Sequence, residues 1–369
     1  IRTLTIAIYK INFIDQVLKK NQYSLVICNT HVYTSNSAIT MRLSLKKKIS
    51  VLMIVNNYFR FYNKLEQAYS QYVDIHKKDL INNSKIYKNW KKKFDFWLKK
   101  RFSGKLLQRD ANKAFNEDKI DMSKLLKYKN IDLKKFKRIG FFAPHAFSDS
   151  NYASGAFLFL NYFEQFKKTI DILEEEKEIF WFINPHPNSQ LYKEENIIKD
   201  YLKNKKIKNF MICPKRINTN DLLKISDIIL TGRGTVGIEA ACIGKKPILA
   251  GSSFYSSCGF THNPKNFEEY KKLILNKKSN YRLTKDEINN AKKAFYTWVF
   301  KNSHVNSNIF PISQFVDVNL KKKKLIQSHY YGSNFLHKIN KTLKKYSLMN
   351  DTFYMELKKF IIQNKNLVR

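Results

Sequence analysis

An apolar run passes into a glycine-spaced loop at residues 227–241, DIILTGRGTVGIEAA. The run is typical of a buried strand, and the loop opens directly into a helical pattern. Backbone N–H groups from Gly234 to Gly237 can therefore converge on an anion at the positive end of that helix. The stretch predicts an α/β unit that binds phosphate, and the alternative is a tight strand–helix turn without a ligand.

Side chains of the same stretch fit a nucleotide. The glycines permit close backbone approach, the threonine hydroxyls donate, Arg233 neutralises charge, and Glu239 could accept hydrogen bonds from a ribose diol. The spacing matches neither the dinucleotide fingerprint nor the P-loop. The donor-binding residues predicted here are Thr231, Gly232, Arg233, Gly234, Thr235 and Glu239.

Strand and helix patterns alternate on both sides of this loop. Apolar strands are expected at 138–143, 179–183, 210–213 and 247–250, which predicts a doubly wound domain over residues 136–285. The same rhythm, with strands expected at 4–9, 23–28 and 49–55, predicts a second α/β domain over residues 1–135. Its first residue is not Met, which is compatible with a truncated start. Residues 286–369 are predicted to form a helical tail.

A histidine between two prolines ends the strand at 179–183, in the sequence INPHPN. Pro restricts its own φ and the residue before it, so His186 and Pro187 are presented at a strand's carboxyl end. Such ends line ligand crevices in open α/β sheets. His186 could donate to a phosphate or protonate a leaving group, against the alternative of a structural histidine.

A second histidine loop follows the strand at 138–143 and contains His145 and Asp149. Asp149 is a candidate general base toward a sugar hydroxyl, and His145 competes for the role. The alternative is that Asp149 forms a helix cap or an Asx-turn. A fourth loop at 251–262 is rich in hydroxyls and aromatics, with Ser253 and Tyr255 as candidate donor contacts. All four loops are expected at one edge of the sheet.

Composition indicates a folded, basic chain of 369 residues, with 68 Lys and Arg against 30 Asp and Glu, a net charge of +38, and 43% apolar residues. The charge favours anionic partners or reflects an AT-rich genome. Reduced thiols and a cytoplasmic location fit four dispersed cysteines. No run of about 20 apolar residues is present, so any membrane contact would be peripheral. The lysine-rich segment 90–101 is either a helix packed by its aromatic stripe or an interfacial helix.

The ordered motifs PHAFSDS, INPHP and SDIILTGRGTVGIEAACIGKKPILAG, followed by a loop ending in GFT, resemble bacterial capsule polysaccharide biosynthesis glycosyltransferases, which are relatives of capsular Kdo-transferases and polysialyltransferases. The resemblance covers about residues 138–275. It implies a GT-B-like fold of two Rossmann-like domains facing a cleft, a nucleotide-activated donor in the second domain, no metal and no other cofactor. It also implies that His186 contacts phosphate and that Glu239 lies on the ribose side.

The expected function is transfer of a sugar from a CMP-, CDP- or UDP-linked donor to an anionic capsular glycan or glycolipid at the inner face of the inner membrane. His186 and Arg233 would hold the leaving phosphate, with inversion at the anomeric carbon. One alternative is transfer of a CDP-activated phosphoryl unit, such as glycerol phosphate, to capsule polymer. A nucleic-acid-binding protein ranks lowest, because no helix-turn-helix, zinc or RNP signature accompanies the charge.

Overall fold

The computed structural model divides the chain into two compact units, residues 72–297 and residues 1–71 together with 298–369. Each unit is considered by itself. The described residues are 2–300 with gaps at 29–34, 56–57, 70–73, 83–88, 107–108, 116–119, 150–154, 190–192, 204, 206–208, 215–216 and 277–280, together with 355, 358 and 362. The predicted tail beyond residue 300 therefore lies almost wholly outside the described residues, and the predicted domain boundaries stay predictions.

A five-stranded sheet forms the middle of unit 72–297, in the order β6-β5-β4-β7-β8. All four strand pairs are parallel, which confirms the predicted doubly wound sheet. Strand β4, the first of the five in the sequence, lies at the centre of the sheet. The chain adds β5 and β6 on one side of β4 and then β7 and β8 on the other, so the strand order reverses between the neighbours β4 and β7. The strands are β4 (Arg138–Ala143), β5 (Ile179–Ile183), β6 (Phe210–Ile212), β7 (Ile228–Thr231) and β8 (Ile248–Leu249).

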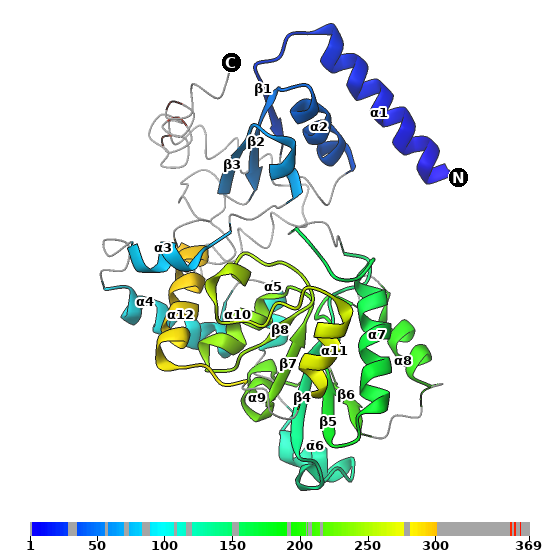
Figure 1. The fold of residues 1–369 in the computed structure, drawn as a ribbon, viewed down its shortest axis with the longest axis vertical. Helices are drawn as coiled ribbons and strands as arrows, with labels where there is room; N and C mark the ends of the chain where they lie inside the picture. Colours follow the sequence, from blue (N-terminus) through cyan, green and yellow to red (C-terminus); the bar gives the residue numbers. More distant parts are fainter. Residues whose placement is uncertain are drawn as a thin grey trace, which may run out of the picture. The chain divides into compact units, whose positions relative to one another are not determined.

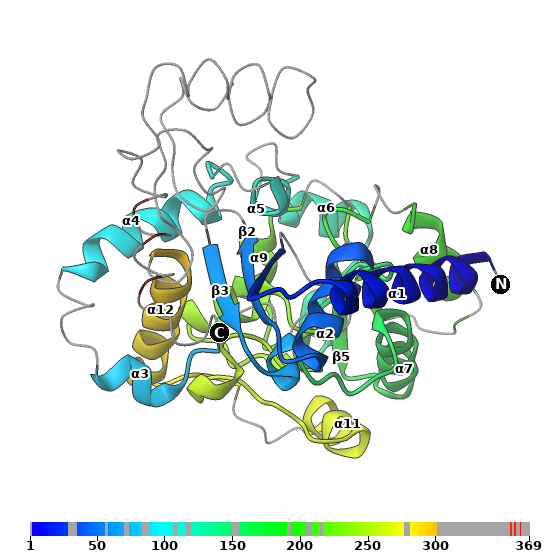
Figure 2. The ribbon, with the colours of Figure 1, turned by 90° about the horizontal axis from the view of Figure 1, so that it is seen from above.

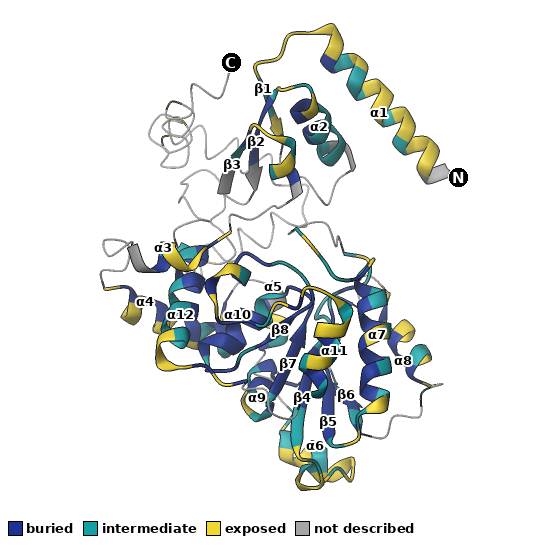
Figure 3. Ribbon diagram, in the orientation of Figure 1, coloured by how far each residue is buried: buried dark blue, intermediate teal, exposed yellow. Residues whose placement is uncertain are grey.

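Helices cover both faces of this sheet, which is why its strands are buried almost throughout (Figures 1 and 3). Alternate residues of β5 face opposite layers: Trp181 packs in a core with α7 (Tyr162–Glu175), α8 (Glu195–Lys203) and α11 (Phe267–Leu275). Phe182 packs in the other core, with α6 (Met122–Tyr128) and α9 (Thr219–Ile225). Strands buried on both faces consist of continuous apolar runs, which made them predictable.

Asparagine caps begin three of the helices that surround the sheet. The side chains of Asn161, Asn218 and Asn266 each accept a backbone N–H of the first turn of α7, α9 and α11. Each cap fixes the residue at which a loop ends and its helix begins. The caps therefore restrict the conformations of the loops at this edge of the sheet.

Three further helices of this unit lie side by side, α3 (Lys77–Asn82), α4 (Trp90–Phe102) and α12 (Lys285–Phe300) (Figures 1 and 2). The aromatic stripe of α4 is buried: Phe94 is fully enclosed, and its ring lies 5.9 Å from that of Phe295 on α12. The packed-helix interpretation of segment 90–101 is therefore correct. An interfacial helix that inserts this stripe is ruled out.

Remaining short elements of unit 72–297 are α5 (Arg109–Ala114), α10 (Thr235–Cys242) and two 3₁₀ turns, η2 (Leu133–Lys135) and η3 (Ser256–Cys258).

The other unit is also α/β, which agrees with the predicted fold class of two α/β units. Strands β1 (Leu25–Cys28) and β2 (Ser50–Val55) are parallel and joined by α2 (Ser35–Lys46), as expected. Strand β3 (Tyr58–Tyr62), before the turn η1 (Leu65–Tyr69), pairs antiparallel with β2 and is not among the expected strands. The expected strand at 4–9 is wrong, because these residues belong to helix α1 (Arg2–Lys20). Ile6 and Ile8 are exposed on this helix, so neither burial nor the β propensity of isoleucine, which depends on context, imposes a strand there.

Candidate functional site

Four loops with polar residues leave the same edge of the five-stranded sheet, because all its strands are parallel. The loops after β4 and β7 flank the point at which the strand order reverses, and the loop after β5 is their neighbour. Ligands of open α/β sheets bind outside the carboxyl ends of the strands at such a point. The topology thus brings the predicted histidine loops and the glycine loop to one place.

A row of stacked rings connects the two histidines to the glycine loop. The ring of His145 lies 5.1 Å from that of His186, at 18° between planes, and 4.3 Å from that of Tyr162, at 13°. The guanidinium of Arg233 lies 6.0 Å from the Tyr162 ring centre. A Cβ on Gly232 would lie 3.4 Å from Tyr162 Cε1. The row of rings therefore links His186 to the glycine loop through His145 and Tyr162.

His186 has a defined orientation within this row. Its Nδ1 accepts the backbone N–H of Asn188 at 3.2 Å, so in the neutral ring Nε2 carries the proton. Pro185 and Pro187 frame the residue, as the sequence predicted, and both line a cavity together with it. His186 can thus donate one hydrogen bond from Nε2 to an anion.

His145 is held as a neutral base. Burial, with the charge of Arg233 as a second cause, lowers the pKa of His145 to about 4. Its Nδ1 lies 3.5 Å from Oδ2 of Asp149, and the Asp149 N–H donates to Ala146 O at 3.2 Å in a tight turn. Helix α7 is capped by Asn161, so Asp149 is not its cap. Both candidates for the general base lie together in the site.

Arg233 is a residue of the glycine loop, and it is buried, with 7% of the residue exposed. Its guanidinium donates to Ala156 O at 3.3 Å and lies 4.9 Å from the Phe157 ring centre. Burial lowers the pKa of Arg233 from its ordinary value, although the side chain keeps its cationic role. Nε is buried without a hydrogen-bond partner within the described residues. A buried cation with an unused donor beside the loop favours an anionic ligand.

Gly234 is the N-cap residue of α10 and has no side chain to cap it. The Gly237 N–H donates to Gly234 O at 3.1 Å, so this one of the predicted anion donors is already used. Any Cβ on Gly237 would collide with the Tyr255 hydroxyl, which explains the glycine there. The prediction that backbone N–H groups at the start of α10 contact a phosphate is therefore limited to those nearer Gly234.

The side chains of Ser253 and Tyr255 are hydrogen-bonded to the backbone of the glycine loop. The Tyr255 hydroxyl donates to Gly234 O at 2.6 Å, and the Ser253 hydroxyl donates to Arg233 O at 3.2 Å. Both residues are buried, and burial raises the pKa of Tyr255 well above its ordinary value. Thr231, the last residue of β7, is also buried. These hydroxyl groups position the loop, and donor contact by them stays a prediction.

Glu239 is engaged in a buried ion pair that sequence reasoning missed. Its Oε1 accepts from Nε of Arg101 at 2.6 Å and lies 2.5 Å from Nη2, with 1% of Arg101 and 2% of Glu239 exposed. Arg101 Nη2 also donates to Thr235 Oγ1 at 3.4 Å. Arg101 ends a lysine-rich run on α4 and has no local signal that separates it from its solvated neighbours.

A cavity of about 480 Å³ adjoins the histidine loop. Its wall contains His186 and the residues that follow β5 and β6, with Lys113 and Lys199 as cationic groups. Lys113 Nζ donates to Asn188 Oδ1 at 3.3 Å, which links it to the His186 loop. The volume suits a nucleoside or sugar, with cations available for an anion. Lys113 follows no sequence motif and was missed.

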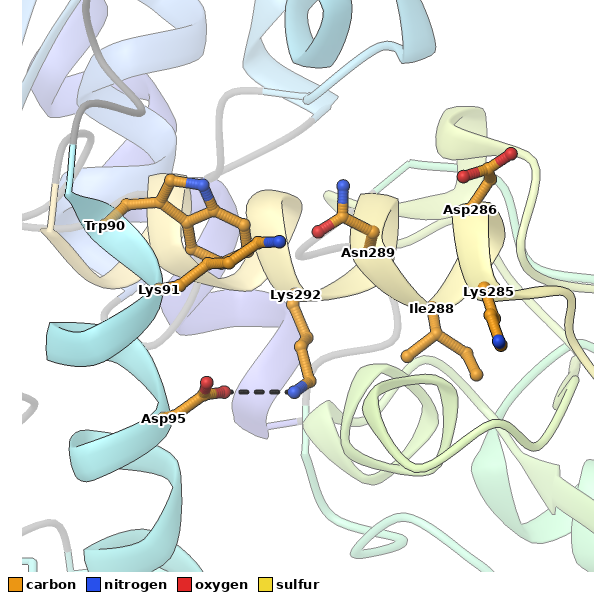
Figure 4. Close-up of a pocket in the computed structure, with 8 residues that line it drawn as sticks. All are labelled: Trp90, Lys91, Asp95, Lys285, Asp286, Ile288, Asn289 and Lys292. Carbon is orange, nitrogen blue, oxygen red and sulfur yellow. Dashed lines mark hydrogen bonds and ion pairs between the residues drawn. The ribbon is translucent and has the colours of Figure 1, made fainter.

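A second hollow of about 440 Å³ lies between α4 and α12 (Figure 4). Lysine and aspartate side chains line it, and Lys292 pairs with Asp95 at 3.0 Å. It is formed by different elements from those that carry the histidine loops.

Among the described residues, no group of three or more His, Cys, Asp or Glu side chains is placed to hold a metal ion. None of the described helices is both long enough and apolar enough to cross a membrane.

The fold and the loops define a doubly wound α/β domain with two histidines, an arginine and a glycine loop gathered at its topological switch point. Residues 150–295 match the family model "Capsule polysaccharide biosynthesis protein", which confirms the family resemblance over that part of the chain. No curated protein matches the sequence.

Solved structures with low similarity to this chain include a transferase and an epimerase. A beta Kdo 2,4 transferase, KpsC of Thermosulfurimonas dismutans, is 16% identical, with a TM-score of 0.39, over 73% of this chain and 78% of that chain. UDP-GlcNAc 2-epimerase from Neisseria meningitidis, bound to UDP-GlcNAc, is 15% identical, with a TM-score of 0.33, over 80% and 81%.

Proposed function

We propose that this protein is a glycosyltransferase of capsule polysaccharide biosynthesis that uses a nucleotide-activated donor, linked to CMP, CDP or UDP. The observation that supports it most is the contiguity of His186, His145, Tyr162 and Arg233 at the switch point of the sheet. In this proposal His186 and Arg233, which lie at the two ends of the row of rings, would both be directed at the donor's phosphates. That is the arrangement needed to stabilise a departing phosphate.

The donor's phosphates would lie between the His186 Nε2–H and the start of α10, with Arg233 behind them. Its nucleoside would enter the cavity beside His186, where Lys113 and Lys199 supply further charge. Glu239 is retained as the ribose-side acid, and Arg101 balances its charge. Removal of one preorganised donor from such a site costs about 10²–10³ in kcat.

Asp149 or His145 would remove the proton from the acceptor hydroxyl as it attacks the anomeric carbon, with inversion and without a metal. The lowered pKa of His145, about 4, keeps its imidazole unprotonated at neutral pH, but it also makes the ring a weak base, which favours Asp149 for the role. Asp149→Asn should lower kcat more than donor affinity if the carboxylate is the base. A wild-type rate in this variant would leave His145 as the base.

The acceptor would be an anionic capsular glycan or glycolipid, which suits a chain with a net charge of +38. The same charge would favour a cytoplasmic protein in peripheral contact with the anionic inner face of the inner membrane.

The test is a thermal-shift panel of CMP, CDP, UDP, GDP and their sugar conjugates, since a ligand that binds the native state raises apparent stability. We expect one pyrimidine nucleotide to stabilise the protein clearly. Product analysis by phosphorus NMR then separates the chemistries: a new phosphodiester would show phosphoryl transfer in place of glycosyl transfer. A panel without any shift, together with salt-sensitive nucleic-acid binding, would refute the proposal.

A further inference from the structure

Glu194 is a buried acid that lies outside the motifs and immediately before α8, with 2% of the residue exposed. The residue before it, Lys193, has a φ of 57°, a left-handed conformation that is uncommon outside glycine. The turn thus accepts backbone strain while it directs the Glu194 side chain inward. A buried carboxylate is costly unless it is hydrogen-bonded, so its partners are informative.

The carboxylate of Glu194 binds the loop that follows β4. Oε2 accepts the Phe147 N–H at 3.0 Å, and Oε1 accepts the Ser148 N–H at 2.7 Å and the Ser148 hydroxyl at 2.6 Å. These three bonds fix the backbone between His145 and Asp149, the two candidate bases. Few side chains other than a carboxylate could accept all three, because the partners are all donors.

The backbone of Glu194 binds the other histidine loop. Its N–H donates to Ser189 O at 3.0 Å, and the Ser189 N–H donates to His186 O at 2.9 Å. One residue therefore reaches both loops whose histidine rings stack 5.1 Å apart. This link adds to the hydrogen bond from the Asn184 N–H to Phe142 O, 2.9 Å long, which joins the two loops where they leave their strands.

We infer that Glu194 is a positioning residue that clamps the loops after β4 and β5 and so sets the relative position of His145 and His186. The inference rests on the proposed function only for its effect on donor binding. Its structural part, the register of the two imidazoles, can be measured whether or not the chain binds a nucleotide.

Glu194→Gln keeps the shape of the side chain but replaces one acceptor oxygen by an NH₂ group. Either orientation of the amide then sets N–H against a donor of Phe147 or Ser148, so at least one bond is lost. Ser148→Ala removes one of the three bonds and leaves both backbone donors paired. Glu175→Gln is the matched control, because that carboxylate is more than half exposed and pairs with Lys271 at the surface.

The histidine resonances of the full chain, assigned with His145→Ala and His186→Ala, give the first readout. Arg233, Asp149, Tyr162 and His186 are the groups around His145, whose pKa is about 4. In Glu194→Gln we expect the His145 midpoint to move toward its ordinary value and both imidazole shifts to change. Ser148→Ala should show a smaller change and Glu175→Gln none.

Affinity for the nucleotide that wild type binds best in the panel gives the second readout. We expect a loss of about 10- to 100-fold in Glu194→Gln, the effect of one misaligned charge-assisted hydrogen bond. If wild type binds none of the nucleotides, the proposed function fails while the NMR readout still tests the clamp. Wild-type histidine spectra and affinity in Glu194→Gln, or a lower melting temperature as its sole change, would overturn the inference.

Discussion

His145 lies in an environment that disfavours the charged form of its ring. It is stacked between Tyr162 and His186, its side chain is 18% exposed, and Arg233 lies near it. Both burial and the neighbouring cation disfavour the imidazolium form. Folding therefore selects the neutral ring, which is what a proton acceptor in this position requires.

This selection makes stability depend on pH. The pKa of His145 is about 4 in the folded chain and near 6.5 when unfolded, so between these values the unfolded state binds more protons. The free energy of unfolding should therefore fall as pH decreases through that window, by up to about 1.4 kcal/mol per pH unit. Urea unfolding from about pH 4 to 7 measures it.

His145→Asn should remove this component of the pH dependence. His76→Asn is the control, because His76 is exposed. Identical pH profiles for wild type and His145→Asn would show that the imidazole is not held neutral by the fold.

Helix α4 is joined to the glycine-loop helix α10 by the buried Arg101–Glu239 pair. Trp97 and Phe295 also lie against the Arg101 guanidinium, at 5.6 and 5.4 Å from their ring centres. The pair is shielded from water, so loss of one partner leaves a buried charge uncompensated. An element outside the matched family segment thereby supports the predicted donor site.

Arg101→Met and Glu239→Leu should each lower the free energy of unfolding by about 3–5 kcal/mol. The double variant should be less destabilised than the sum of the two, since it removes both charges. Denaturant unfolding of the four proteins completes the cycle, with the exposed pair Lys203 and Asp200 as a control cycle. Additive losses would mean that the two charges do not interact.

Strands enclosed on both faces were predicted correctly from the sequence, whereas the start of helix α1 was mistaken for a strand. Strands β4, β5 and β7 are enclosed on both faces, so their residues form unbroken apolar runs that identify them. The apolar residues of α1 give a similar local signal, yet Leu4, Ile8 and Phe13 are exposed on a helix. Local composition cannot specify which surface a segment will find.

The site residues also divide into those that the sequence predicted and those that it did not. Motif residues such as His186 and Arg233 lie at strand ends, where topology alone brings them together. Arg101, Tyr162 and Glu194 act through contacts between segments far apart in the chain, such as the 138 residues that separate Arg101 from Glu239. No periodicity or spacing encodes such contacts in a single sequence.

At the scale of the whole molecule, the site lies entirely within unit 72–297, with the five strands and both cores. We expect a fragment of residues 72–297 to unfold cooperatively and to bind the same nucleotide as the full chain, within about a few-fold. Circular dichroism and calorimetric titration check this. A fragment that folds but does not bind would show that the other unit contributes donor contacts.

The central claim is that His186 and the glycine loop hold one anionic group. Calorimetric titration of the full chain with a nucleoside diphosphate and with its parent nucleoside, in wild type, His186→Ala and the exposed control His76→Ala, tests it most directly. We predict that His186→Ala weakens diphosphate binding by about 10- to 100-fold and nucleoside binding by much less, because the nucleoside keeps the rest of the cavity wall. Equal diphosphate affinity in wild type and His186→Ala would contradict the claim.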